Sequence, residues 1–235
     1  MKILCVIPAR SGSKGIKHKN IKLVNGKPML AWSVEHAKCC KYENQMKIIV
    51  STDSKEYAKL ARKYGAETPF LRPSEISGDL STDFECINHA VNWLEINENY
   101  MPDIVLHLRP TQPCRKIDDV NNALDLFIKN RDNYDSLRSV IPVEKSPFKM
   151  YLTQNGELKP LFSNINNINE PYNQSRQVLP QAYLHNGYID ILNVSILKNN
   201  TISGNKILPY IMNKTDNIDI DYEDDIKNIL KNIKK

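Results

Sequence analysis

The chain lacks the features that mark several common classes of protein. Its 235 residues include five cysteines, an odd number, with no CxxC pair. Neither a zinc site nor a disulfide framework is therefore indicated. No apolar run approaches the ~20 residues of a membrane span. The run from Ile3 to Ile7 is too short for a signal sequence and has no small-residue cleavage site. We expect a protein of a reducing compartment, the cytoplasm, with no membrane contact.

A long run of one charge sign is also absent. The formal net charge is +5, and the lysines and arginines are spread along the chain. A nucleic-acid-binding protein would gather them in a stripe or a tail. No nucleic acid is therefore expected as a partner, whereas an anionic small molecule suits this mild basicity.

The first two thirds of the chain alternate continuous apolar runs with amphipathic segments. Continuous runs suit strands that are covered on both faces of a parallel sheet, and they fall at 3–7, 47–50, 104–108 and 139–141. Helix starts are indicated by Pro28, by Asp53 with Glu56, and by Thr82 with Glu85. This alternation predicts an α/β fold of βαβ units with a mainly parallel sheet.

The alternation weakens after Pro147. Asn155-Gly156 is a strong hairpin signal, and the Asn-rich stretch 163–174 is typical of an irregular or mobile loop. Strand character returns at 188–192 and 206–208, and a helix ends the chain. We expect one domain, residues 1–235, with an insertion at about 145–185 that forms a lid or a dimer arm.

The segment from Pro8 to Asn20, PARSGSKGIKHKN, carries the clearest chemical signal. It follows the first strand directly, where open α/β sheets place their ligands. Its glycines and serines let backbone amides approach an anion. Its four cations suit a triphosphate; they are Arg10, Lys14, Lys17 and Lys19. A solvated basic loop is the alternative interpretation, and the position after the strand argues against it.

Neither standard nucleotide fingerprint is present in this segment. Walker A requires GxxxxGK[ST], but Lys14 precedes Gly15 and no hydroxyl residue follows. The pattern GxGxxG fails as well, because the glycines fall at Gly12 and Gly15. The loop is therefore a phosphate cradle of another kind, which spacing alone does not name.

The string from Ile7 to Leu30 resembles the start of the acylneuraminate cytidylyltransferases, or CMP-nonulosonate synthetases. Four later segments match in order: LRP at 71–73, LRPTQP at 108–113, RQVLPQ at 176–181 and DID at 219–221. The resemblance covers essentially the whole chain. It implies a Rossmann-like three-layer nucleotidyltransferase domain, usually a homodimer with an inserted arm from each subunit. It also implies transfer of CMP from CTP to an acidic nine-carbon sugar, with release of pyrophosphate.

The resemblance assigns roles to individual residues. The residues implied to bind the nucleotide are Arg10, Ser13, Lys14 and Lys19 for the CTP phosphates, Asn20 for the ribose and Arg72 for cytosine. Those implied to surround the sugar are Arg109, Lys149, Arg176, Gln181 and Asn186. Asp219 and Asp221 are implied to bind Mg²⁺, and with Arg10 and Lys19 they form the expected catalytic set.

The two aspartates are also supported by geometry. An extended chain places both carboxylates on one face and turns Ile220 the other way, into the core. Mg²⁺ takes few carboxylates together with phosphate oxygens, so two suffice. The alternative is that Asp219 and Asp221 cap a helix beginning at Tyr222. No general base is evident in the sequence.

Two positions depart from many sialic-acid members of this family. Glutamine is common where this chain has Arg109, and arginine where it has Leu184. A relative such as legionaminate is therefore as plausible a substrate as N-acetylneuraminate. The competing functions are a CMP-Kdo synthetase, which uses an eight-carbon acid, a DxD-type glycosyltransferase, and a nucleotide-binding protein without catalysis.

Overall fold

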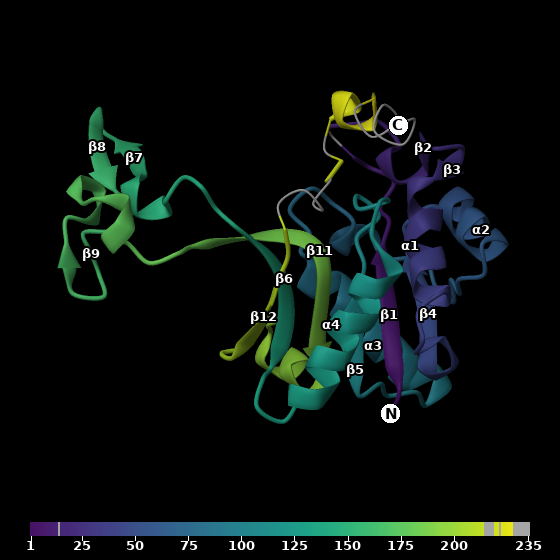
Figure 1. The fold of residues 1–235 in the computed structure, drawn as a ribbon. Helices are drawn as coiled ribbons and strands as arrows, with labels where there is room; N and C mark the ends of the chain where they lie inside the picture. Colours follow the sequence, from purple (N-terminus) through teal and green to yellow (C-terminus); the bar gives the residue numbers. More distant parts are fainter. Residues whose placement is uncertain (14, 214–218, 221, 228–235) are drawn as a thin grey trace.

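A computed structural model describes residues 1–13, 15–213, 219–220 and 222–227 (Figure 1). Its centre is a six-stranded sheet. The strands in spatial order are β12 (Ile207–Ile211), β6 (Ser136–Pro142), β11 (Tyr183–Asn193), β5 (Ile104–His107), β1 (Ile3–Pro8) and β4 (Met46–Ser51). Strand β11 is antiparallel to both neighbours, and the other neighbouring pairs are parallel. The prediction of a mainly parallel α/β sheet is confirmed.

Helices cover both faces of this sheet. They are α1 (Met29–Lys38), α2 (Lys55–Lys63), α3 (Asp83–Glu98) and α4 (Ile117–Asn130). Along β1, Ile3 and Cys5 pack with side chains of α1, α2 and α4, whereas Leu4 and Val6 pack with α3. All four side chains are fully buried. Burial on both faces explains why the strand is a continuous apolar run.

Two of the predicted helix starts differ in outcome. Thr82 and Glu85 form the capping box at the start of α3, as predicted. The box predicted for Asp53 and Glu56 is wrong, because the N-cap of α2 is Ser54. The Asp53 carboxylate instead accepts hydrogen bonds from the loop after β1. Asp53 therefore pairs with Ser11, which is distant in the sequence, and does not cap the helix that follows it.

Between β6 and β11 the chain forms an arm, residues 143–182, that projects away from the sheet (Figure 1). It contains two hairpins, β7 (Tyr151–Gln154) with β8 (Glu157–Pro160), and β9 (Asn164–Ile165) with β10 (Ile168–Asn169). The first turns at Asn155-Gly156, as predicted, with φ of 53° and 81°. The second corrects the prediction of an irregular stretch at 163–174. Asn166 and Asn167 form its turn because asparagine tolerates positive φ.

A further small hairpin joins β2 (Leu23–Val24) to β3 (Lys27–Pro28) beside the first helix. In the part of the chain that the structure describes, no helix has both the length and the apolar character of a membrane span.

Candidate active site

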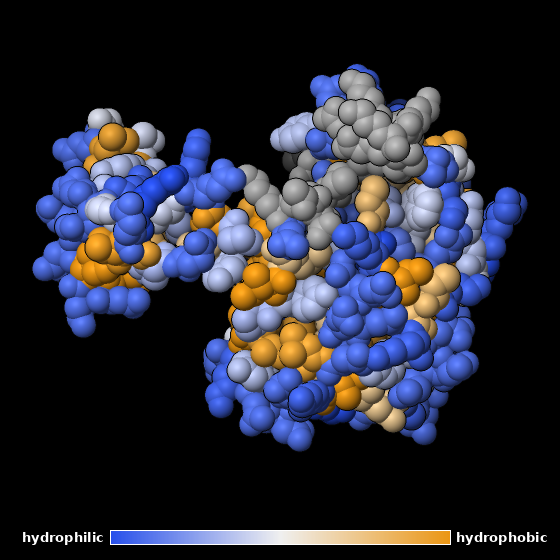
Figure 2. Space-filling view, in the orientation of Figure 1, coloured by the Kyte–Doolittle hydropathy of each residue, from blue (hydrophilic) through white to orange (hydrophobic). Residues whose placement is uncertain are grey.

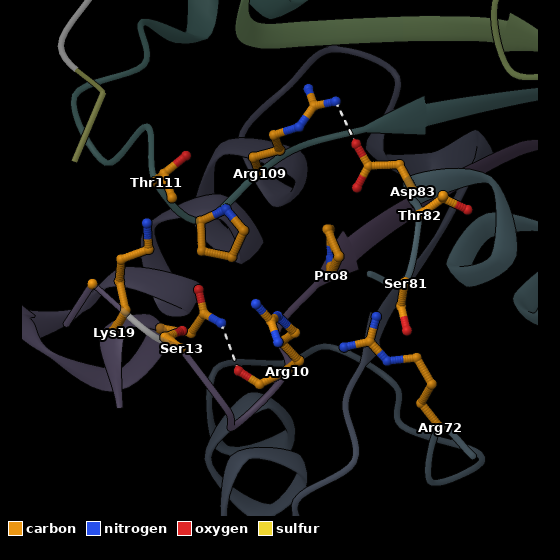
Figure 3. A pocket seen from close by; sticks show the side chains of 13 residues that line it. Pro8, Arg10, Ser13, Lys19, Arg72, Ser81, Thr82, Asp83, Arg109 and Thr111 are labelled. Atoms are coloured by element: carbon orange, nitrogen blue, oxygen red, sulfur yellow. Dashed lines mark hydrogen bonds and ion pairs between the residues drawn. The ribbon is translucent and has the colours of Figure 1, made fainter. Parts of the chain in front are cut away.

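A cleft of about 330 Å³ opens at the carboxyl ends of the adjacent strands β5, β1 and β4 (Figure 3). Three segments line it, and they lie far apart in the sequence. The lining residues are Pro8, Arg10, Ser13, Gly15, Lys19 and Asn20 after β1; Arg72, Ser81, Thr82 and Asp83 before and at the start of α3; and Arg109, Pro110 and Thr111 after β5. Open α/β sheets bind ligands at this edge. The predicted nucleotide-binding residues that the structure describes therefore share one cleft.

The loop after β1 is held in place by two side chains. The Ser11 backbone N–H and hydroxyl both donate to the Asp53 carboxylate, each at 2.8 Å. The Asn20 side-chain amide donates to the backbone carbonyl of Arg10 at 2.9 Å. Hydrogen bonds to a charged group are stronger than those between neutral groups. Asp53 therefore fixes the backbone that presents the cationic side chains.

Two cations of this loop already have partners at the cleft. The Arg10 guanidinium lies 2.7 Å from the Asp79 carboxylate, and both side chains are partly exposed. The Lys19 ammonium donates to the backbone carbonyl of Ile220 at 3.0 Å. A partly exposed ion pair contributes at most about 1 kcal/mol, so a phosphate can replace it at little cost. Lys14 lies outside the described residues.

The segment at Asp219-Ile220 docks beside the loop. The Ile220 backbone N–H donates to the Thr111 carbonyl at 3.0 Å. The Ile220 side chain is fully buried in a cluster with Ile16 and Met29, whereas Asp219 is exposed. The prediction that Ile220 faces the core is therefore confirmed. Because Lys19 and Thr111 both line the cleft, Asp219 lies at its border.

The donor set at this segment suits a hard divalent cation. Asp219 is an exposed carboxylate outside any helix or strand, and Asp221 lies outside the described residues. Within the described ranges, no three histidine, cysteine, aspartate or glutamate side chains form a metal cluster. Mg²⁺ does not need such a cluster, because it retains water and takes phosphate oxygens beside one or two carboxylates.

Arg72 is the buried cation of the cleft. Its side chain lines the cleft although the residue is only 6% exposed. Its backbone N–H donates to the Thr52 carbonyl at 2.8 Å, next to the end of β4. Its Nε and Nη2 atoms are buried and have no nitrogen or oxygen acceptor among the described residues, and the nearby Cys86 thiol is only a weak acceptor. A buried donor without a good acceptor is costly, so these N–H groups are available to the acceptors of a ligand.

Arg109 lines the opposite wall of the cleft but is not free. Its guanidinium contacts the carboxylates of Asp83 and Asp190, each at 2.7 Å. Burial alone would raise the pKa of Asp190. The close approach of His107 and His185 and the charge of Arg109 outweigh that effect and hold this pKa well below its usual range. Asp190 is therefore a buried anion that fixes the arginine.

Three predicted sugar-site residues lie in the arm. Lys149 donates to the backbone carbonyls of Tyr172, at 3.4 Å, and of Gln174. Arg176 donates to the carbonyl of Glu144 at 2.7 Å. Arg176 and Gln181 line a separate hollow of about 440 Å³ at the base of the arm. Within one chain the structure does not bring these residues to the cleft.

Asn186 is the fourth predicted sugar-site residue outside the cleft, and it lies inside the sheet. It is 6% exposed, and its side-chain oxygen accepts from the Ser139 hydroxyl at 2.6 Å and from the Tyr188 backbone N–H at 3.2 Å. These contacts lie at a bulge of β11, where its register against β6 shifts between His185 and Asp190. Among the five predicted sugar-site residues, Arg109 therefore lines the cleft and the other four do not.

Several acidic residues of the site escaped the sequence interpretation. Asp53 is predicted only as part of a helix start and Asp83 has no predicted role. Asp83 nevertheless lines the cleft, and Asp53 holds the loop after β1 that forms one wall of it. Asp190 carries a signal in the sequence, because it is an acid within the apolar run 188–192. A charged residue in a buried strand needs a partner, and here the partner is Arg109.

The cleft combines a cationic loop after β1, a buried arginine and a carboxylate segment at one sheet edge. This combination is typical of a nucleotidyltransferase, an enzyme that handles a nucleoside triphosphate. A family model for cytidylyltransferases matches residues 4–235. The chain therefore belongs to the cytidylyltransferase family, and the resemblance inferred from its motifs is confirmed. Enzymes of this class use CTP as the nucleotide donor.

Several relatives match along most of the chain. The CMP-N,N′-diacetyllegionaminic acid synthase of Legionella pneumophila is 34% identical, over 94% of this chain and 91% of the relative. The post-translational flagellin modification protein B of Campylobacter coli is 32% identical, over 96% and 92%. The N-acylneuraminate cytidylyltransferase of Escherichia coli is also 32% identical, but the match covers 94% of this chain and 49% of that protein.

Solved structures of lower identity share the fold. A CMP:2-keto-3-deoxy-manno-octonic acid synthetase complexed with CTP superposes with a TM-score of 0.69 at 16% identity, covering 100% of this chain and 99% of the other. The 4-diphosphocytidyl-2C-methyl-D-erythritol synthase of Anaerococcus prevotii gives a TM-score of 0.62 at 13% identity, covering 100% and 99%. These likenesses support the nucleotidyltransferase fold and no particular substrate.

Proposed function

We propose that this protein transfers CMP from CTP to a nine-carbon 2-keto sugar acid, a nonulosonate such as a sialic or legionaminic acid, and releases pyrophosphate. The observation that carries the proposal is the cleft itself, where Arg10, Ser13, Lys19 and Arg72 lie together beside the Asp219 segment. Relatives named for legionaminate and acylneuraminate substrates, at 32–34% identity, support the choice of acceptor.

The reaction needs no covalent enzyme intermediate. The anomeric hydroxyl oxygen of the sugar bonds to the α-phosphorus of CTP as the bond to the α,β-bridging oxygen breaks. The hydroxyl gives up its proton to water, and pyrophosphate departs. Positioning and charge neutralisation supply most of the catalysis in such transfers. Arg10 and Lys19 carry out the second task by stabilising the charge that develops on the leaving pyrophosphate.

We propose that Arg72 binds cytosine through its unpaired N–H groups and that Asn20 lies near the ribose. Cytosine offers a ring nitrogen and a carbonyl oxygen as acceptors, which the two buried donors of Arg72 suit. Lys14 joins the phosphate-binding set from a position outside the described residues.

Asp219 and Asp221 would hold Mg²⁺ at the border of the cleft. When bound, this cation neutralises phosphate charge and lowers the pKa of the attacking hydroxyl. Two hydrogen bonds hold the Asp219 segment beside the loop after β1. The Lys19 ammonium donates to the Ile220 carbonyl, and the Ile220 backbone N–H donates to the Thr111 carbonyl. These two hydrogen bonds hold the segment that carries Asp219 at the border of the cleft, where we propose that the triphosphate binds.

The arm suits a homodimer. We propose that the arm of a second copy covers the cleft and brings Lys149, Arg176 and Gln181 toward the sugar. The supporting observation is that these residues lie outside the cleft of their own chain. The arm also carries exposed apolar side chains, among them Leu152 and Leu158 at 61% and 67%. We place the reaction in the cytoplasm.

Pyrophosphate release from CTP tests the function directly. The protein is incubated with CTP, Mg²⁺ and each of N-acetylneuraminate, di-N-acetyllegionaminate and Kdo. We expect release only with a nonulosonate. Release with Kdo alone would establish the eight-carbon rival. No release with any acid, combined with consumption of a preformed nucleotide sugar, would favour a glycosyltransferase.

A further inference from the structure

Arg115 is a buried cation behind the wall of the cleft that residues 109–111 form. Only 3% of its surface is exposed. A charge taken out of water costs free energy unless an opposite charge compensates for it. The groups that face this guanidinium therefore show whether its charge is cancelled.

Every nitrogen of the Arg115 guanidinium donates to an uncharged acceptor. Nε donates to the Tyr188 backbone carbonyl at 2.7 Å, and Nη2 donates to the Arg109 carbonyl at 3.0 Å. Nη1 donates to the Ser33 hydroxyl at 3.4 Å and to Nδ1 of His36 at 3.2 Å. The Tyr188 ring lies 5.4 Å from the guanidinium carbon, close enough for a cation–π contact. No carboxylate among the described residues forms an ion pair with Arg115.

The titratable side chains around Arg115 do not supply a negative charge. Burial raises the pKa of the Cys5 thiol and of the Tyr188 phenol, so both stay protonated and neutral. Burial lowers the pKa of His36 to about 3, so this ring is neutral as well. Burial also lowers the pKa of Arg115, to about 10, although the charge of Asp219 acts in the opposite direction. The guanidinium is therefore positive at neutral pH, and the balancing charge of Asp219 lies beyond ion-pair distance.

The charged side chains beside this loop have partners of their own. The Arg109 guanidinium belongs to a set of two guanidiniums and two carboxylates, which are Arg109, Arg138, Asp83 and Asp190. Protonation of His107 or His185, which lie against these carboxylates, would only add positive charge. The set therefore has no surplus negative charge that could neutralise Arg115.

The wall in front of Arg115 leads to the part of the cleft where the cationic loop lies. The Thr111 carbonyl accepts from Ile220, and the Ile220 carbonyl accepts from Lys19. Lys19 and Thr111 lie on the same side of the cleft (Figure 3). Buried charges are screened little by salt. Two unit charges about 10 Å apart in a protein change an equilibrium constant about tenfold, so contact with the ligand is not required.

We propose that the buried guanidinium of Arg115 attracts the triphosphate of CTP through the cleft wall without touching it. Hydrogen bonds alone could be supplied by a neutral amide, which costs less to bury than a cation. A cation adds an attraction that grows with the charge of the ligand. This inference rests on the proposed function, because it takes CTP as the ligand.

The test compares two ligands that share cytosine and ribose but differ in charge. Dissociation constants of CTP and CMP are measured by calorimetry without Mg²⁺, so that no metal contributes to binding. In Arg115→Gln and Arg115→Met, the Kd of CTP should rise about tenfold and that of CMP about threefold, because the attraction scales with ligand charge. Arg115→Lys keeps the charge and should retain most of the affinity for CTP. A merely displaced loop would weaken the binding of both nucleotides by the same factor.

Ser33→Ala is the matched control. The Ser33 hydroxyl donates to the same Arg109 carbonyl, at 3.2 Å, and accepts from Arg115, but its loss removes no charge. Both dissociation constants should therefore change less than about twofold. Melting temperatures show which variants are folded.

A pH series with Arg115→Lys replaces the neutral variants if neither of them folds. Burial lowers the pKa of an ammonium, so this variant should lose affinity for CTP, relative to the wild type at the same pH, as the pH rises. The loss for CMP should be smaller. Equal losses for the two nucleotides, or no change with pH, would overturn the proposal.

The remaining outcomes separate the role of Arg115 from the proposed function. A wild type that binds CTP but releases no pyrophosphate with any nonulosonate contradicts the function and leaves the attraction measurable. If folded Arg115→Gln and Arg115→Met weaken CTP and CMP equally, or weaken neither, only the role of Arg115 is overturned. The same holds if Ser33→Ala weakens CTP as much as Arg115→Met does.

Discussion

The body of the molecule and its arm differ in how much apolar surface they bury within one chain. In the body, every residue of β1 from Ile3 to Ile7 is fully buried between two layers of helices. In the arm, every residue of β7 is exposed, and so are the first three residues of β8. Figure 2 shows apolar side chains gathered on the surface of the arm.

This difference shows which part is stable without help. A two-stranded hairpin is at best marginally stable in water, whereas a sheet covered by helices has its own core. Exposed apolar patches on soluble proteins commonly mark contacts with a partner. The body therefore has a core of its own, and the homodimer proposed above would cover the exposed apolar side chains of the arm. The predictions below separate these two roles.

The largest expected effect belongs to the body. Asp219→Asn and Asp221→Asn should each lower kcat about 100-fold or more, because a metal ligand lost during phosphoryl transfer costs several kcal/mol. Turnover at saturating Mg²⁺ and the melting temperature are measured together. Near-normal turnover with an unchanged melting temperature would show that these aspartates only cap a helix.

Variants of the cationic loop after β1 should have the next largest effect. Arg10→Ala and Lys19→Ala should each lower kcat/KM for CTP about 30-fold, because a cation that contacts phosphate is worth about 2 kcal/mol. Lys41→Ala should change it less than about twofold. Each of the three variants loses one positive charge. Arg10 and Lys19 line the cleft, whereas Lys41 forms an exposed ion pair with Asp125 outside it. Equal losses in the three would indicate a general field and contradict the cradle.

A substitution on the arm should affect dimerisation and leave the fold of the body intact. Leu152→Ser should weaken dimerisation about tenfold, because burial of a leucine contributes roughly 1.5–3 kcal/mol. Sedimentation over a concentration series gives the dissociation constant. Ile96→Ser is the control, since Ile96 is 80% exposed on helix α3 of the body. If the chain is monomeric throughout, or if both variants behave alike, the arm is not the interface.

The smallest effect concerns a residue that acts through another. Asp53→Asn should raise KM for CTP about fivefold while kcat changes little, because one of two charge-assisted hydrogen bonds to Ser11 is lost. In Asp53→Glu, KM for CTP should rise more than half as much as in Asp53→Asn, since the longer side chain displaces the carboxylate. A lower melting temperature with unchanged KM would show that Asp53 stabilises the fold and does not position the loop.

Preference between whole sugars adds a finer measurement. Leu184 is 55% exposed at the start of β11, close to the bulge that holds Arg109. The wild type should prefer a deoxy di-N-acyl nonulosonate to N-acetylneuraminate, with some activity on both, since rejecting an added hydroxyl discriminates only about 100-fold at most. The ratio of kcat/KM values should fall in Arg109→Gln. A wild-type preference for N-acetylneuraminate would contradict this.

The sequence by itself determined several features that depend on short-range pattern. Continuous apolar runs identify the buried strands, and Asn155-Gly156 identifies a hairpin because few residues accept positive φ. Alternation along an extended chain turns Ile220 inward and Asp219 outward. The cationic loop was recognised because its place after the first strand fixes its place at the sheet edge.

Tertiary structure alone decided which distant charges meet. Asp53 stands at cap spacing in the sequence, yet its carboxylate binds Ser11, 42 residues away. Arg109 reads as a free cation, but the fold places it against Asp83 and Asp190, which are 26 and 81 residues away. The arm likewise carries Lys149 away from the cleft of its own chain. Sequence periodicity gives information only about neighbours along the chain. A buried charge needs a partner, and that partner is set by the packing of strands and helices.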